Sequence, residues 1–203
     1  MNTKQPAPLM MALLLAACGQ DATAPASTAP VDEPPLAGAS IGGDFALQTA
    51  NGETVSNDSL KGQWRLIYFG YTFCPDICPV DTERMGRAYA AIEAQAPELA
   101  GQLTPVFITV DPERDTPEIA GEFAANFHPD MIGLSGSQQA VDDAVNTFRV
   151  YKAKGDVRDD GFYLMDHSAN IYLFDADGQP ISFYERDISA DEMARDVMRW
   201  IRK

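Results

Sequence analysis

The stretch Trp64-Arg-Leu-Ile-Tyr-Phe-Gly-Tyr-Thr-Phe-Cys-Pro-Asp-Ile-Cys-Pro79 joins a short apolar run to two cysteines. Residues 64–69 are nearly all apolar, which is typical of a central strand that is buried on both faces. Cys74 and Cys78 follow where the strand gives way to a helix, and free N–H groups at a helix start favour a thiolate. The cysteine pair (Cys74 and Cys78) can therefore hold a soft metal ion or cycle between dithiol and disulfide. The inactive alternative is a structural disulfide or two buried thiols.

Strands and helices are expected to alternate on both sides of this stretch. Asn51-Gly52 is a strong turn signal and predicts an N-terminal β-hairpin. After the cysteine pair we expect helices over residues 81–96, from 116 and over 138–148, with strands at 104–110 and 131–134. A hairpin of residues 170–174 and 180–184 follows, and then a last helix with a capping box of Ser189 and Glu192. This order predicts an α/β, thioredoxin-like fold with an N-terminal β-hairpin and one inserted helix over residues 41–203.

The first 40 residues are expected to direct the chain to a membrane. Lys4, the short apolar run 9–15 and Leu15-Ala-Ala-Cys18 predict a lipoprotein signal peptide over residues 1–17. Leu-Ala-Ala-Cys resembles the bacterial lipobox, which implies acylation of Cys18; a conventional signal peptide cut elsewhere is the alternative. Residues 18–40 are rich in Pro and Ala and predict a semi-extended tether. The protein would then be lipid-anchored in a bacterial cell envelope, facing the periplasm or the cell exterior, where disulfides persist.

The composition is acidic, with 15 Lys and Arg against 30 Asp and Glu and a formal net charge of −15. This balance argues against nucleic acid and anionic lipid headgroups as partners. It mildly favours basic protein surfaces, although solubility alone accounts for it equally well.

The two histidines have different expected roles. His128 lies where a helix meets a turn, which is typical of a helix cap or a surface residue. His167, in Met165-Asp-His-Ser168, precedes the late hairpin, and a thioredoxin-like fold places that loop at the same end of the sheet as the cysteine pair. A thioredoxin has a cis-proline in this region, whereas this chain has no proline between Pro129 and Pro180. Two thiolates and one imidazole form a set suited to copper and able to hold Cu(I).

Three motifs together resemble the Sco/SenC family: the cysteine pair after Tyr68-Phe-Gly-Tyr-Thr-Phe73, then Val110-Asp-Pro-Glu-Arg-Asp-Thr-Pro117, then Asp166-His167-Ser168. The resemblance implies copper, as Cu(I) or Cu(II), bound by Cys74, Cys78 and His167. It also implies delivery of copper to, or maintenance of the thiols of, the binuclear copper centre of cytochrome c oxidase subunit II. Many members carry a transmembrane helix where this chain has a lipobox, so the resemblance leaves open which membrane holds the anchor.

Other functions and roles compete with these. A thiol–disulfide oxidoreductase or redox sensor needs the cysteine pair but not the imidazole, and a thiol reductant protein would then be a partner. A peroxidase of the peroxiredoxin type is disfavoured, because such proteins place Thr three residues before the reactive Cys and this chain has Tyr71 there. Residues 111–117 predict either a docking or gating loop or a strand exit with a helix cap. Asp166 is a candidate for fixing the His167 tautomer, and Asp175-Ala-Asp-Gly178 is read as a turn and not as a calcium loop.

Overall fold

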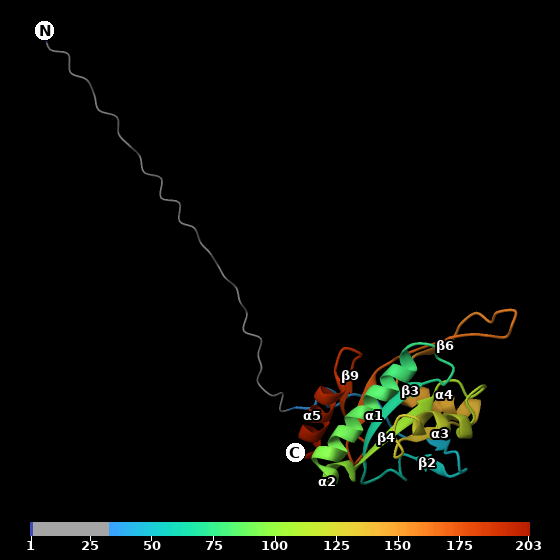
Figure 1. Cartoon of the computed structure of the whole chain (residues 1–203), viewed down its shortest axis with the longest axis horizontal. Helices are drawn as coiled ribbons and strands as arrows, with labels where there is room; N and C mark the ends of the chain where they lie inside the picture. Colours follow the sequence, from blue (N-terminus) through green and yellow to red (C-terminus); the bar gives the residue numbers. More distant parts are fainter. Residues whose placement is uncertain (2–32) are drawn as a thin grey trace. The chain divides into compact units, whose positions relative to one another are not determined.

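The computed structural model describes Met1 and residues 33–203, and the latter are built around a five-stranded sheet (Figure 1). In spatial order its strands are β5 (Ile132–Leu134), β4 (Leu103–Thr109), β3 (Trp64–Gly70), β8 (Ile171–Phe174) and β9 (Pro180–Tyr184). Strand β3 is central: it pairs in parallel with β4 and antiparallel with β8. The carboxyl ends of β3 and β4 therefore meet at one edge, which is where the cysteine pair begins.

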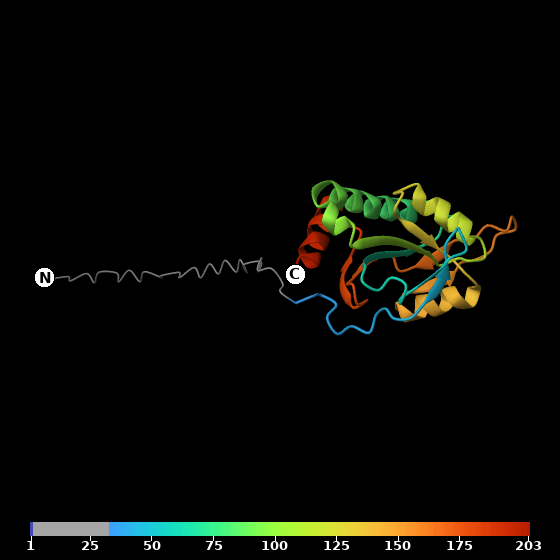
Figure 2. The ribbon, with the colours of Figure 1, turned by 90° about the horizontal axis from the view of Figure 1, so that it is seen from below.

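Helices cover both faces of this sheet. They are α1 (Ile77–Gln95), α2 (Pro97–Ala100), α3 (Pro117–Ala125), α4 (Gln138–Thr147) and α5 (Ala190–Ile201). Figure 2 shows α1 and α3 on one side of the sheet and α4 on the other. Because both faces are covered, the middle of β3 is apolar, and Leu66, Ile67, Tyr68 and Phe69 are all fully buried.

The predicted order of elements is confirmed. The N-terminal hairpin is formed by β1 (Ala46–Gln48) and β2 (Thr54–Ser56). Helix α5 begins with the predicted capping box, in which the Ser189 hydroxyl accepts from the N–H of Glu192 and the Glu192 carboxylate accepts from the N–H of Ser189. A strand–helix–strand core followed by a hairpin and a terminal helix gives a thioredoxin-like α/β fold.

Three local features differ from the predictions. Helix α1 begins at Ile77 and not at residue 81, so Cys78 and Pro79 lie in its first turn. Proline is tolerated there because the first N–H groups of a helix have no intrahelical partner. The short helix α2 was not predicted, and neither was a second hairpin of β6 (Lys152–Lys154) and β7 (Met165–His167). Figure 1 shows the loop between β6 and β7 projecting from the domain.

The predicted signal peptide, Cys18 and most of the predicted tether lie outside the described residues. The described end of the tether is attached to the domain: Leu36 packs against the core, and its N–H donates to the carbonyl of Ile181 at 3.1 Å. The packed domain thus begins before residue 41, where its start was expected. Among the residues that the structure describes, no helix is long and apolar enough to cross a membrane.

Candidate metal centre

The cysteine pair lies between the end of β3 and the first turn of α1. Cys74 is half-buried in the connecting loop, and its N–H donates to the Tyr71 carbonyl at 3.3 Å. Cys78 is the second residue of α1 and is fully buried. Its N–H has no carbonyl partner within the helix and donates to Cys74 Sγ at 3.4 Å. Both thiols are free. A free N–H group of the first turn of α1 thus stabilises the sulfur of Cys74.

His167 is brought to this pair by the hairpin that the sequence did not predict. It is the last residue of β7, opposite Lys152 of β6, and its Nε2 lies 3.3 Å from Cys78 Sγ. Its Nδ1 lies 2.9 Å from the Ser168 carbonyl oxygen. Because a carbonyl can only accept, Nδ1 carries the proton, and the lone pair of Nε2 faces the thiol. This is the tautomer that a metal-binding imidazole needs.

Two tyrosines hold the imidazole ring from its sides. The ring of Tyr71 packs edge-on against His167 with centroids 5.8 Å apart, and the ring of Tyr68 does so at 6.2 Å. Tyr68 is fixed in turn, because its hydroxyl donates to the buried Asp81 carboxylate at 3.2 Å. Burial raises the pKa of Tyr71 to about 12 and also raises the pKa of Tyr68, so both side chains are neutral at physiological pH.

The two thiols are electrostatically unequal. The hydrogen bond from the Cys78 thiol, helped by backbone N–H groups of Cys78 and Asp76, lowers the pKa of Cys74 to about 5 against the cost of burial. The same hydrogen bond, together with burial, raises the pKa of Cys78 well above its ordinary value. At neutral pH the pair therefore carries one negative charge on the half-exposed sulfur and one proton on the buried sulfur.

The donor types fit copper, although the three side chains do not yet converge. In residues 33–203, no three Cys, His, Asp or Glu side chains are arranged around a common point where they could hold an ion. Cys78 and His167 are adjacent, and Cys74 is joined to Cys78 through the N–H of the latter. Two sulfurs and an unprotonated imidazole nitrogen form a soft donor set, which suits Cu(I) better than hard cations.

Asp166 does not fix the tautomer of His167. It is exposed, and the alternation of side chains along β7 directs it away from the face that carries the imidazole. The Ser168 carbonyl accepts the Nδ1 proton instead. The prediction for Asp166 was wrong because the sequence cannot show which acceptor, the Asp166 carboxylate or the Ser168 carbonyl, lies beside Nδ1 of His167.

His128 and the turn at 175–178 have structural roles. His128 is buried and not at the surface: its ring packs on Tyr89 with centroids 4.7 Å apart, and its Nε2 lies 3.5 Å from a Glu93 carboxylate oxygen. The predicted turn at 175–178 is confirmed, because the Asp175 carboxylate accepts from two N–H groups of the turn, those of Asp177 and Gln179.

Sequence reasoning missed Tyr68, Tyr71 and Asp81. The signal for the tyrosines was their place on the strand that leads into the cysteine pair. For Asp81 the signal was an acid three residues after Cys78, a spacing that places both on one face of a helix. None of these signals distinguishes a wall of the site from an ordinary core residue.

Comparison with known proteins shows the family to which this chain belongs. A family model described as SCO1/SenC matches residues 33–202. The SCO2-like protein of Rickettsia conorii is 42% identical over 171 residues, which are 79% of this chain and 81% of that protein. The crystal structure of Arabidopsis thaliana ScoI with copper bound is 37% identical, with a TM-score of 0.73 over 80% of this chain and 98% of that one.

Two more distant structures bear on chemistry and fold. BsSco, described as a member of the Sco family of cytochrome c oxidase assembly proteins and as having a disulfide switch, is 27% identical with a TM-score of 0.61 over 79% of this chain and 92% of that one. The thioredoxin domain of a thiol-disulfide oxidoreductase from Bacteroides vulgatus is 16% identical with a TM-score of 0.56 over 80% of this chain and 96% of that one. The last of these supports the thioredoxin-like fold alone.

Proposed function

The chain belongs to the SCO1/SenC family, and from this premise we propose that it binds copper through Cys74, Cys78 and His167 and delivers it to an oxidase. The target is the binuclear copper centre of cytochrome c oxidase subunit II. The observation that carries the proposal is the position of His167: its Nε2 lies 3.3 Å from Cys78 Sγ and its Nδ1 lies 2.9 Å from the Ser168 carbonyl oxygen, at the end of the sheet that also carries Cys74. The copper-bound structure of Arabidopsis thaliana ScoI supports the copper-binding part of the proposal, and the description of BsSco supports the part on oxidase assembly.

Each protein group has a defined part in holding the ion. Cys74 is ionised at neutral pH and half-exposed, so it is the group that incoming copper meets first. Cys78 must lose its proton to become a ligand, and His167 already presents its lone pair. Bound copper contributes a preference for soft, low-coordinate ligands, and three donors of this kind satisfy it.

Copper titration of the detergent-solubilised full chain tests the ligand set. The reduced protein is expected to bind one Cu(I) with sub-micromolar affinity in competition with a chromophoric chelator. Cys74→Ser and Cys78→Ser should abolish tight binding, and His167→Ala should weaken it. His128→Ala is the matched control, because that imidazole is held by Tyr89 and Glu93. Equal affinity in wild type and His167→Ala would remove His167 from the proposed site.

The proposed location is a bacterial cell envelope, with residues 1–17 as a lipoprotein signal peptide, Cys18 as the acylated anchor and the Pro- and Ala-rich segment as tether. Two acyl chains make anchoring stable where one would be marginal. Facing the periplasm or the cell exterior, the domain would meet subunit II at the membrane surface. The formal net charge of −15 predicts that this association weakens as salt concentration rises.

Thiol–disulfide exchange is the second candidate function, and the low pKa of Cys74 favours it specifically. In that case the chain would maintain the thiols of subunit II and itself require a thiol reductant protein. A deletion strain separates the two candidates. Added copper should restore oxidase activity if the chain delivers copper, whereas a membrane-permeant reductant should restore it if the chain maintains thiols. Unchanged oxidase activity in the deletion strain at every copper level would contradict both.

A further inference from the structure

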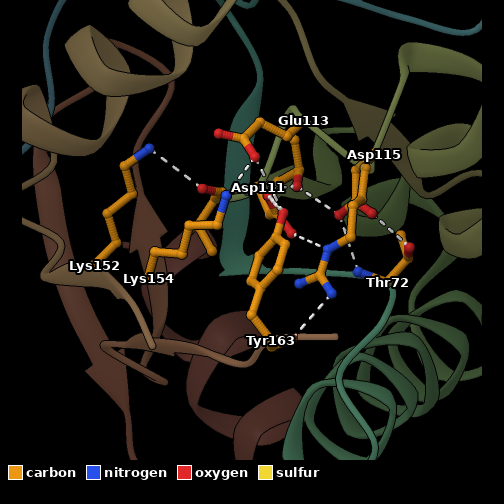
Figure 3. A network of polar contacts seen from close by, with 10 residues as sticks. Thr72, Asp111, Glu113, Asp115, Lys152, Lys154 and Tyr163 are labelled. Atoms are coloured by element: carbon orange, nitrogen blue, oxygen red, sulfur yellow. Dashed lines mark hydrogen bonds and ion pairs between the residues drawn. The ribbon is translucent and has the colours of Figure 1, made fainter. Parts of the chain in front are cut away.

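We propose that residues 111–115, here called the acidic bracket, position the two halves of the metal centre, with Arg114 as the residue that holds His167 in place. This inference rests on the proposed function for its copper readout but not for its structural readouts. The bracket leads from the end of β4 to α3, whose N-cap is Thr116. It contacts both the loop that carries the cysteine pair and the hairpin that carries His167 (Figure 3).

Asp115 ties the bracket to the cysteine loop. It is fully buried, and its carboxylate accepts from the Thr72 N–H at 2.9 Å and from the Thr72 hydroxyl at 2.6 Å. It also accepts from the Thr109 hydroxyl at 2.6 Å. Figure 3 shows the pairing of Asp115 with Thr72. Thr72 lies two residues before Cys74, so this carboxylate sets where the cysteine loop leaves β3.

Arg114 ties the bracket to the histidine hairpin. Its Nη1 donates to the Tyr163 carbonyl at 3.0 Å, and its Nε donates to Asp111 at 2.6 Å. The Tyr163 hydroxyl donates back to Asp111 at 2.9 Å, which closes a ring of contacts (Figure 3). Tyr163 lies four residues before His167, on the chain segment that enters β7. Two lysines of β6 add further ties: Lys154 pairs with Glu113, and Lys152 donates to the Val110 carbonyl at 3.2 Å.

The Arg114 guanidinium also touches the site through aromatic rings. Its Cζ lies 3.6 Å from the ring centroid of Tyr163, 5.0 Å from that of Phe73 and 5.6 Å from that of Tyr71. The Tyr71 ring also packs against His167, at 5.8 Å between centroids. One cation thus contacts the residue before Cys74, the wall of the imidazole and the hairpin that bears it.

Burying the Arg114 guanidinium is energetically unfavourable, which argues that the bracket does more than connect a strand to a helix. Nη2 of Arg114 is buried and has no hydrogen-bond partner among the residues that the structure describes, and an unpaired buried donor is unfavourable. A docking role fits poorly, since Asp111 and Asp115 are 3% and 0% exposed. The remaining acid, Glu113, is paired with Lys154. The contacts of the bracket are therefore made with the two ligand-bearing segments.

Arg114→Gln removes the guanidinium group with its positive charge. Arg195→Gln, at an exposed position of α5, is the control for the change in charge. In the metal-free full chain we expect amide exchange in residues 152–167 to rise about 10-fold or more while exchange in α5 stays constant. The ¹⁵N signals of the His167 ring should move from a single Nδ1–H tautomer to a mixture. Cu(I) affinity should fall about 10- to 100-fold, the range typical for residues that orient metal ligands.

Unchanged hairpin exchange and an unchanged His167 tautomer in Arg114→Gln would overturn the proposal. If the variant fails to fold, Tyr163→Phe decides instead, because it keeps the ring and the backbone carbonyl and removes only the hydroxyl, which contacts Asp111 and Glu113. Exchange in the hairpin should then rise about 2- to 10-fold, and no rise would overturn the proposal. If the wild-type chain binds no copper, the proposed function fails, and the exchange and tautomer data still decide the role of Arg114.

Discussion

Cys74 should react with a small neutral disulfide at about pH 5.5 roughly 20 times faster than an ordinary cysteine. With a pKa of about 5, about three quarters of Cys74 is thiolate at that pH, against about one in a thousand for an ordinary thiol of pKa about 8.5. A less basic thiolate is also a weaker nucleophile. With a Brønsted coefficient of about 0.45, the difference of about 3.5 pK units lowers its reactivity roughly 40-fold. The ratio of thiolate fractions, about 760, divided by about 40 leaves the 20-fold advantage.

The pH dependence is the diagnostic part of this prediction. At about pH 7 an ordinary thiol is already about 3% ionised, so the thiolate advantage of Cys74 falls to about 30-fold and the weaker nucleophilicity cancels it. Cys74 should therefore react at nearly the same rate from about pH 6 to pH 8, while the reference slows about tenfold per pH unit below its pKa. Cys78 should not react first, because it is fully buried and its pKa is raised.

The assay follows loss of free Cys74 in reduced, metal-free protein by acid quenching and mass spectrometry. The same chain unfolded in urea is the reference, so that the effect of pH on the reagent cancels in the ratio. Cys78→Ala should shift the plateau to higher pH, because the thiol of Cys78 is the largest cause of the lowered pKa of Cys74. A rate at about pH 5.5 no greater than that of the unfolded reference would refute the assignment of the thiolate to Cys74.

Three further predictions concern packing, protons and attachment. Gly86→Ala should destabilise the domain by about 1–3 kcal/mol in urea unfolding, because a Cβ there would lie 2.7 Å from the Phe127 carbonyl oxygen. The control is Gly101→Ala, which should be neutral or stabilising, because φ is −63° there and the nearest atom to a Cβ is 3.6 Å away. Binding of Cu(I) at about pH 7 should release about one proton, since one thiol of the cysteine pair is already ionised; an indicator dye in weak buffer measures this, and a value near zero or two would contradict it. Cys18→Ser should abolish metabolic labelling by a fatty acid, and labelling that persists would show that the anchor lies elsewhere.

The sequence predicted the framework of the fold well, because its signals there are local. An apolar run predicted β3, Asn51-Gly52 predicted the first hairpin, and Ser189 with Glu192 predicted the start of α5. The β6–β7 hairpin could not be predicted in the same way. Its strands have three residues each, and β6 is Lys-Ala-Lys, so neither has an apolar period to detect.

The site was predicted in its donor residues but not in its support. Cys74, Cys78 and His167 have chemically distinctive side chains, and the fold class indicated that they share one end of the sheet. The Arg114 contacts depend on the exact path of a loop and a hairpin that are 49 residues apart in the chain, as between Arg114 Nη1 and the Tyr163 carbonyl. Motif residues 111–117 were recognised, but whether their acids face solvent or the interior is decided by tertiary packing.

The position of His167 changes how the two candidate functions should be separated. As a copper ligand its Nε2 donates a lone pair to the metal. In thiol exchange, Cys78 must lose its proton before its sulfur can attack a mixed disulfide at Cys74, and the same Nε2, 3.3 Å from Cys78 Sγ, is placed to accept that proton. Replacing His167 would therefore impair both activities, although only one of them needs it as a ligand. Discrimination has to come from what is supplied, copper or reducing equivalents, because the same three side chains serve both reactions.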